Sequence, residues 1–149
     1  MTKSNLHVAL AQRLRIEGEE DSQILAVVTH LKAGLGEEAE RERTEQVHTL
    51  LKRVSEAKLP TVVLADLNCG DRPLHTDTGA TLEPKVHPLL AARGFRSAFA
   101  AAAGAEPGYT CWGGWHCHDV AGVFDYVLCF GRRLQARRAL DVPRAEAVL

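Results

Sequence analysis

An aspartate and an asparagine two residues apart mark the most informative point of the sequence. Asp66 and Asn68 follow the run 61–65, whose β-branched and apolar residues predict a short buried strand. Residues 68–73 predict a loop. Because side chains alternate along a strand, we expect Asp66 and Asn68 to point to the same side. Such a pair can activate water, hold a hard cation or donate a hydrogen bond to phosphate, or it can close the strand in an Asx turn.

Two further titratable side chains belong to predicted strands. His30 ends the apolar run 24–30, where a histidine is either structural or a group whose charge is easily tuned near neutral pH. Asp125 lies in the run 123–130 and shares its predicted face with apolar residues of that run. Because burying an unpaired carboxylate is costly, Asp125 needs a partner. That partner is either a structural hydrogen bond or a histidine of a neighbouring strand that Asp125 orients.

The remaining pattern predicts the elements that position these side chains. Two apolar runs separated by a polar segment favour an antiparallel hairpin. A longer segment carries one apolar stripe at helical spacing, with glutamates at its start, and we expect its charged residues to form a solvated face. A shorter helix stopping at Gly94 and an alanine-rich helical turn follow the central strand. The predicted ranges are 6–12 and 24–30 for the hairpin, 37–57 and 85–93 for the helices, 100–103 for the helical turn, and 61–65 and 123–130 for the other strands.

The composition is that of an ordinary globular domain. The chain has 149 residues, of which 46% are hydrophobic and 25% charged, with a net charge of −1. This balance argues against tight, sequence-independent binding to long nucleic acid. No apolar run approaches the ~20 residues of a membrane span, so we expect no membrane association. The first residues lack the apolar core of a secretion signal, so we predict a cytoplasmic protein.

The four cysteines are therefore expected to be reduced thiols. Cys111 and Cys117 lie close to His116 and His118 in the sequence, which could imitate a zinc site. Their spacing lacks the paired arrangement of a structural zinc site, so we predict no zinc there.

Four motifs in a fixed order carry a family resemblance. They are Thr29-His-Leu-Lys-Ala33, Ala65-Asp-Leu-Asn68, Tyr109-Thr-x-Trp112 and Phe124-Asp-Tyr126. With these motifs the chain resembles the endonuclease/exonuclease/phosphatase superfamily, and within it nocturnin and the related carbon-catabolite-repressor-type deadenylases. The resemblance implies an α/β fold, part of a four-layer α/β/β/α (DNase I-like) sandwich, with a mostly antiparallel sheet and flanking helices.

The resemblance also implies a reaction, the magnesium-dependent attack of water on phosphorus. By position, His30 matches the family histidine that contacts the scissile phosphate, and Lys32 matches a phosphate-binding lysine of the nocturnin type. Asp66 would orient or deprotonate the attacking water, and Asn68 would help to place the water or the phosphate. Asp125 matches the aspartate that buttresses the catalytic histidine.

Two expected motifs have no counterpart in this chain. The family's metal-binding glutamate belongs to an N-terminal half, and the glutamates at 17, 19 and 20 lie in a predicted turn and cannot replace it. The closing Ser-Asp-His motif is also absent after Asp125. We therefore expect residues 1–149 to be a partial domain without metal ligands of its own, in which Mg²⁺ binds weakly or not at all. A fragment, a partial gene model and a degenerate relative all fit this pattern.

Three functions follow from the resemblance and stay open. The first is a phosphoesterase that acts on the 3′ end of RNA or on a phosphorylated nucleotide, inactive in this partial form. The alternative is a non-catalytic remnant that serves as a structural or interaction module. The third is a phosphodiesterase of the same superfamily that acts on lipid head groups or DNA. Without the partner sheet of the sandwich, we expect Val123, Val127 and their neighbours to be partly uncovered and the chain to self-associate through that face.

Overall fold

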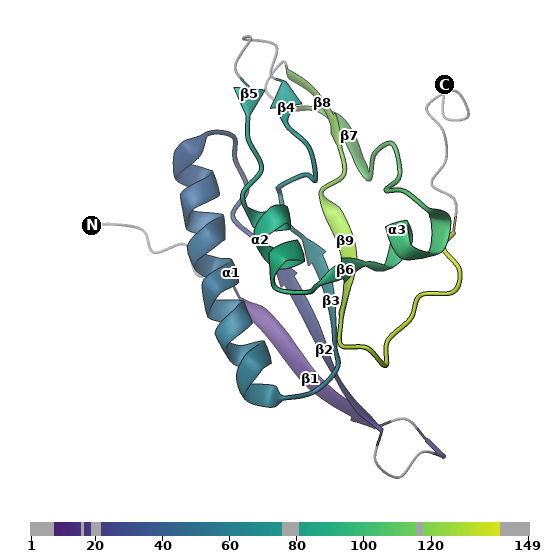
Figure 1. Ribbon diagram of the computed structural model, residues 1–149. Helices are drawn as coiled ribbons and strands as arrows, with labels where there is room; N and C mark the ends of the chain where they lie inside the picture. The colour runs from purple at the N-terminus through teal and green to yellow at the C-terminus, as the bar shows by residue number, and fades with distance from the viewer. Residues whose placement is uncertain (1–7, 16, 19–21, 76–80, 116–117, 141–149) are drawn as a thin grey trace.

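One five-stranded sheet organises the protein (Figure 1). The computed structural model describes residues 8–15, 17–18, 22–75, 81–115 and 118–140, with side chains described for these residues except 112–120. The order of the strands is β1-β2-β3-β9-β6. Only β2 and β3 are parallel, and the other three neighbouring pairs are antiparallel. The strands are β1 Ala9–Arg15, β2 Gln23–His30, β3 Thr61–Asp66, β9 Asp125–Phe130 and β6 Arg96–Ser97.

Two helices, α1 Glu37–Ala57 and α2 Val86–Ala92, cover one face of the sheet (Figure 1). The predicted bounds of α1 are confirmed, because its apolar stripe packs on the sheet as the helical spacing required. The core lies between the helices and the inner side chains of the strands, which alternate with outward-facing residues as strand geometry demands. Its most deeply buried side chains include Val27, Val47, Val63, Val86, Leu90 and Leu128.

The smaller elements lie at the ends of the sheet. The alanine-rich segment forms a short helix, α3 Ala98–Ala103, with Ser97 as its N-cap and Gly104 as its C-cap. The Ser97 hydroxyl accepts a hydrogen bond from the Ala100 N–H at 3.2 Å, so Ser97 caps this helix. Two short hairpins lie beyond the sheet (Figure 1). They are β4 Leu74–His75 with β5 Thr81–Leu82, and β7 Cys111–Trp115 with β8 His118–Gly122. No helix in the part of the chain described here is long and apolar enough to cross a membrane.

The predicted hairpin of β1 and β2 is confirmed. β1 starts at Ala9, and residues 6 and 7 of its predicted range lie outside the described residues. β9 starts at Asp125, two residues later than predicted. Before it, Val123 is buried and the Phe124 carbonyl accepts the Leu67 N–H at 2.7 Å. The prediction that Val123 is uncovered is therefore wrong.

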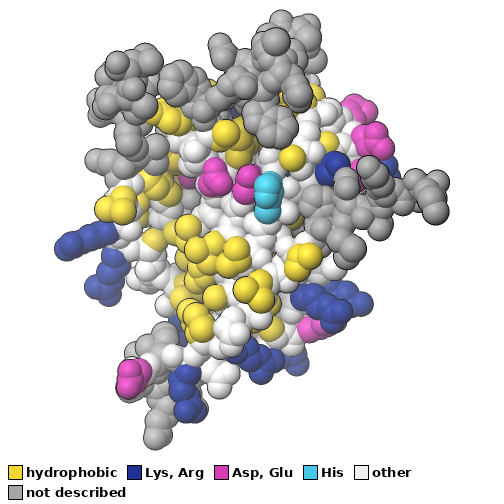
Figure 2. All heavy atoms as spheres, turned by 180° about the vertical axis from the view of Figure 1, so that it is seen from behind, with side chains coloured by type: hydrophobic (Ala, Val, Ile, Leu, Met, Phe, Trp, Pro, Cys, Tyr) yellow, Lys and Arg dark blue, Asp and Glu magenta, His cyan; other side chains and the backbone are white. Residues whose placement is uncertain are grey.

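The sheet face opposite the helices is apolar and open (Figure 2). Val28, Leu64 and Val127 from three neighbouring strands are 51%, 41% and 43% exposed. These residues lie side by side in the strand register, and Leu10 of β1 extends the row opposite Val28. The mixed α/β class with a mostly antiparallel sheet and flanking helices is confirmed, and so is the exposure of Val127. A helix layer on a sheet layer with one bare face is the arrangement expected of part of a sandwich.

A buried ion pair on α1 contradicts the prediction that the charged residues of this helix form a solvated face. Glu40 and Arg43 are only 6% and 4% exposed. The Arg43 Nη2 lies 2.6 Å from the Glu40 Oε2, and Arg43 Nε donates to the same oxygen at 2.8 Å. The residues i and i+3 of a helix share one face, and here that face turns inward. Other charged pairs of α1, such as Arg41 with Glu45, are exposed as predicted.

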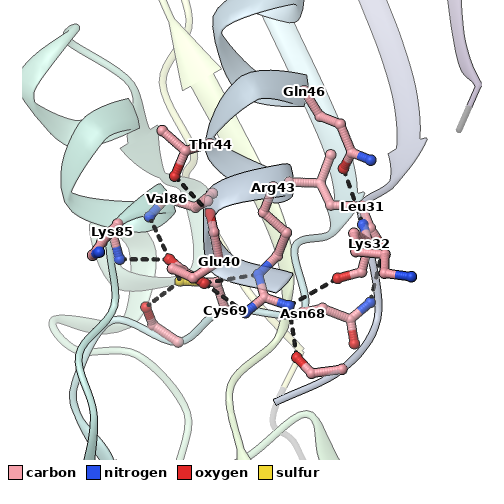
Figure 3. A network of polar contacts seen from close by, with 12 residues as sticks. Leu31, Lys32, Glu40, Arg43, Thr44, Gln46, Asn68, Cys69, Lys85 and Val86 are labelled. Atoms are coloured by element: carbon pink, nitrogen blue, oxygen red, sulfur yellow. Dashed lines mark hydrogen bonds and ion pairs between the residues drawn. The ribbon is translucent and has the colours of Figure 1, made fainter. Parts of the chain in front are cut away.

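This pair connects three segments that are far apart in the sequence (Figure 3). Arg43 Nη1 donates to the carbonyls of Lys32 at 2.8 Å and Gly34 at 2.9 Å, in the segment after β2. The Glu40 Oε1 accepts from the Cys69 thiol at 3.2 Å, in the segment after β3. The same oxygen accepts the backbone N–H groups of Lys85 at 2.6 Å and Val86 at 3.1 Å, at the start of α2. Because a buried charge is tolerated only when it is paired, these segments must come together for the protein to fold.

Burial opposes the ionisation of Glu40, but the Lys85 N–H, the Arg43 guanidinium and the Cys69 thiol that donate to its carboxylate outweigh it. The pKa of Glu40 therefore lies below its ordinary value of 4.5. A carboxyl group with a lowered pKa in the folded state stabilises the fold above its unfolded pKa. That contribution disappears as the pH falls through the folded pKa.

We predict that Glu40→Gln lowers the free energy of unfolding by about 3 kcal/mol at pH 7, because Arg43 is left buried without its counter-charge. The difference from the wild type should shrink as the pH falls below 4.5, because the wild-type carboxyl group becomes protonated as the pH passes through its lowered pKa. Urea unfolding between pH 3 and 7 measures this. Glu45→Gln, at an exposed position one turn away, is the control and should have little effect. A difference that stays constant across this range would contradict the assigned role of the charge.

Candidate functional site

Three predicted site residues form a row across neighbouring strands on the open face of the sheet. His30 ends β2, Asp66 ends β3 and Asp125 begins β9. The strand register pairs His30 with Asp66 and Asp66 with Asp125. Residues that are directly opposite in a sheet lie on the same face, so the three side chains are neighbours. Figure 2 shows acidic and histidine side chains next to the hydrophobic patch of this face.

The closest contact in the row joins His30 and Asp66. The His30 Nε2 lies 3.4 Å from the Asp66 Oδ2, and the two side chains are 68% and 33% exposed. The other carboxylate oxygen of Asp66, Oδ1, accepts the Asn68 N–H at 2.9 Å. One oxygen of Asp66 therefore closes the Asx turn that the sequence allowed, and the other faces the His30 imidazole.

Asn68 is not held in the way predicted. β3 ends at Asp66, and Asn68 has a φ of +47°, a left-handed conformation that asparagine tolerates. The alternation of a strand does not extend to it, so the prediction that Asp66 and Asn68 share one side by strand geometry is wrong. Instead, the Asn68 carboxamide donates from Nδ2 to the Leu31 carbonyl at 3.1 Å and ties the end of β3 to the segment after β2.

The partner of Asp125 is Thr110. Its hydroxyl donates to the Asp125 Oδ2 at 2.9 Å and accepts the N–H groups of Phe124 at 2.9 Å and Asp125 at 3.0 Å. Asp125 shares the open, apolar face with Val127 as predicted, but it is exposed rather than buried. Asp66 lies between Asp125 and His30, so Asp125 does not orient His30 directly. The motif that begins at Tyr109 was the signal for Thr110, but the sequence alone assigned this threonine no role.

Lys32 lies two residues beyond His30, outside the strand (Figure 3). Its backbone N–H donates to the Gln46 Oε1 at 3.0 Å, and its carbonyl accepts from Arg43. Among the described residues no ion pair engages its ammonium group, which leaves the charge free for a ligand.

A cleft of about 610 Å³ opens beside Asp66 and Asp125. Its walls are mainly apolar, with polar groups of the row at one end. A second cavity of about 660 Å³ lies between β1, β2 and α1, on the other face of the sheet and away from the row. The lining of the first cleft includes Val28, Leu64, Phe99, Pro107, Thr110 and Val127.

The described residues do not fit a metal site. No group of three or more His, Cys, Asp or Glu side chains among them could hold an ion. One oxygen of each carboxylate in the row already accepts a hydrogen bond, from the Asn68 N–H and the Thr110 hydroxyl. Mg²⁺ requires near-octahedral oxygen coordination and keeps its waters when few ligands are offered. Of the zinc-like cluster, His116 and Cys117 lie outside the described residues.

The pKa of the Cys111 thiol depends on the charges of the row. Burial, and then the charges of Asp125 and Asp66, raise the pKa of its thiol. We predict that Asp125→Asn, which keeps an oxygen for Thr110, lowers the Cys111 pKa and speeds its alkylation by about two- to threefold at pH 8. Peptide mass spectrometry after a short iodoacetamide pulse measures the rate. Cys129, where burial raises the pKa and Arg96 opposes the shift, is the internal control and should not change. Equal rates at Cys111 in both proteins would contradict the placement.

The fold and the row can now be compared with known proteins. No protein-family profile and no curated protein sequence matches the chain. The catalytic domain of human nocturnin, solved with a bound sulfate anion, is similar with a TM-score of 0.58 and 27% sequence identity over 83% of this chain. An endonuclease/exonuclease/phosphatase family protein from Bacteroides thetaiotaomicron is similar with a TM-score of 0.53 and 11% identity, also over 83% of this chain.

The chain spans only 41% and 42% of these two structures. The second likeness concerns the fold alone, because its sequence identity is low. The resemblance to nocturnin extends to sequence. The chain thus has the fold of the endonuclease/exonuclease/phosphatase proteins over about two fifths of their length, and within that superfamily it resembles the catalytic domain of nocturnin.

Proposed function

We propose that the row and Lys32 form part of the phosphate site of a magnesium-dependent phosphoesterase of the nocturnin or deadenylase type. The observation that carries the proposal is the register, which brings His30, Asp66 and Asp125 together from three strands. The sulfate bound by the nocturnin catalytic domain supports it, because sulfate has the shape and charge of a phosphate group. The proposed substrates are the 3′ end of RNA or a phosphorylated nucleotide.

Each residue has a role that its chemistry supports. His30 and Lys32 would donate to the oxygens of a tetrahedral anion, since charge-assisted hydrogen bonds are the stronger kind. Asp66 Oδ2 would accept a proton from the attacking water or orient it. The Asn68 carboxamide gives one of its two N–H hydrogens to the Leu31 carbonyl, so its second N–H would donate to a phosphate oxygen and its carbonyl oxygen would accept from the water. Asp125, held by Thr110, would buttress the family's catalytic histidine, which has no counterpart in this chain.

The metal of the superfamily would supply charge neutralisation at phosphorus. Since the donors described above do not complete a coordination shell, we expect this chain to bind Mg²⁺ weakly or not at all. We propose that residues 1–149 supply one part of a domain, and that the glutamate and Ser-Asp-His motifs come from another part.

We predict that the chain binds inorganic sulfate and that His30→Ala and Lys32→Ala each raise the dissociation constant about tenfold. Both side chains lie at a strand exit, so each substitution should change the free energy of unfolding by less than ~1 kcal/mol. NMR titration with sulfate measures affinity, and Lys52→Ala, at an exposed position of α1, is the control. A large loss of stability in His30→Ala would support a structural histidine instead.

We predict that a substitution at Asp66 lowers turnover without weakening anion binding. In a polypeptide that also supplies the glutamate and Ser-Asp-His motifs, Asp66→Asn should lower turnover by about 10²–10⁴-fold. The same change should leave sulfate affinity equal or tighter, because a negative charge beside His30 is removed. Assays with adenylate RNA and with a phosphorylated dinucleotide in Mg²⁺ measure turnover. Equal turnover of variant and wild type would remove Asp66 from the reaction.

The open apolar face favours a second candidate, an interaction module without catalysis. Val28, Leu64 and Val127 form a continuous exposed patch with Leu10 of the edge strand. Large exposed apolar patches in soluble proteins mark partner surfaces or cause aggregation.

We predict that the chain self-associates through this face. On a sizing column the wild type should elute earlier as its concentration rises, and the double variant Leu64→Lys/Val127→Lys should elute as a monomer. Leu35→Lys, at an exposed position that is not on this sheet face, is the matched control and should behave as the wild type. A wild type that stays monomeric at every concentration would rule out the interaction surface.

A further inference from the structure

The segment Leu31–Lys32 is irregular, but its backbone is fully engaged (Figure 3). It directly follows β2 and carries the proposed phosphate-binding lysine. Unpaired backbone groups in such a segment would allow it to move. Here all four have partners: Leu31 N–H with the Asp66 carbonyl at 2.9 Å, Leu31 carbonyl with Asn68 Nδ2 at 3.1 Å, Lys32 N–H with Gln46 Oε1 at 3.0 Å, and Lys32 carbonyl with Arg43 Nη1 at 2.8 Å.

Both backbone groups of Lys32, its N–H and its carbonyl, are held by side chains of α1. Arg43 and Gln46 are three residues apart and therefore lie on the same face of the helix. Arg43 cannot swing away, because Glu40 holds its Nε and Nη2 while its Nη1 reaches the Lys32 and Gly34 carbonyls. An arginine whose planar fork is fixed in this way acts as a rigid donor.

A role in packing does not account for this arrangement. Gln46 is only half-buried, and its one contact in this network is the hydrogen bond to the Lys32 N–H. A side chain that served the core would be apolar and buried, as the neighbouring Val47 is. The Gln46 carboxamide therefore acts on one residue, because its hydrogen bond fixes the backbone conformation of Lys32.

We propose that Arg43 and Gln46 are positioning residues of the phosphate site, and this inference rests on the proposed function. They do not touch the anion. They fix the backbone of Lys32, so that the base of this side chain is already in place before the anion arrives. A site arranged in advance binds more tightly because less conformational freedom is lost on binding.

The test uses the full chain and Gln46, whose substitution leaves no unpaired buried charge. Gln46→Met keeps the length of the side chain but removes the acceptor. Gln46→Glu restores an acceptor and serves as the rescue in hydrogen exchange alone, since its added negative charge would itself weaken sulfate binding. Glu45→Met, one residue away and exposed, introduces the same methionine outside the network, and the ion pair with Arg41 that it removes is exposed to solvent.

Two readouts are expected to change together. Amide hydrogen exchange at Lys32 should be about five- to tenfold faster in Gln46→Met, the scale of one hydrogen bond, and should return to the wild-type rate in Gln46→Glu. The dissociation constant for sulfate should rise about fivefold in Gln46→Met. The melting temperature and the exchange rates in β3 should match those of Glu45→Met, which a general loss of stability would not allow.

The outcomes separate this inference from the function on which it rests. If the wild type binds sulfate and Gln46→Met binds it equally well, the positioning role is overturned and the phosphate site stands. If the wild type does not bind sulfate, the proposed function falls. Hydrogen exchange then decides the remaining claim, because faster exchange confined to Lys32 supports the fixing of its backbone and an unchanged rate overturns it.

Discussion

The buried contact between Glu40 and Arg43 is the constraint on which the rest of this structure depends. A carboxylate and a guanidinium at 6% and 4% exposure are stable only if nearly every donor and acceptor between them is satisfied. The partners that satisfy them are backbone groups from the segments after β2 and before α2, together with a thiol after β3. The requirement for pairing thus determines the path of three loops, although the pair itself takes no part in the proposed chemistry.

The two carboxylates of the row, unlike the buried pair, lie where their charges repel each other. Asp66 and Asp125 are directly opposite on antiparallel strands, and like charges in that position destabilise a sheet. Each carboxylate is fixed by one local hydrogen bond, from the Asn68 N–H and from Thr110, while its second oxygen is not used in this way. The acceptor capacity that remains at the surface is consistent with the role proposed for Asp66, which is to accept a proton from water.

Local patterns predicted much of this fold. The apolar stripe of α1 and the β-branched run of β3 depend on residues close in sequence, and both elements were placed correctly. The sequence also marked His30 and Asp66 at the ends of apolar runs and Asp125 within one, and the strand register brings these three side chains together. The role of Glu40 could not be read from the sequence, since its i+3 pairing with Arg43 looks the same in solvent as in a core. Only the tertiary positions of Lys32 and Lys85 distinguish the two, and these depend on contacts across 11 and 45 residues.

The single parallel pairing of the sheet has a consequence for how the candidate site is distributed along the chain. Parallel strands need a crossover, and α1 supplies it between β2 and β3, so residues 23–66 form one continuous β-α-β unit. His30, Lys32 and Asp66 all belong to this unit. Asp125 follows on a strand almost sixty residues later. One β-α-β unit thus carries the proposed phosphate-contacting residues and the first carboxylate, and the antiparallel pairing of β3 with β9 adds the second carboxylate.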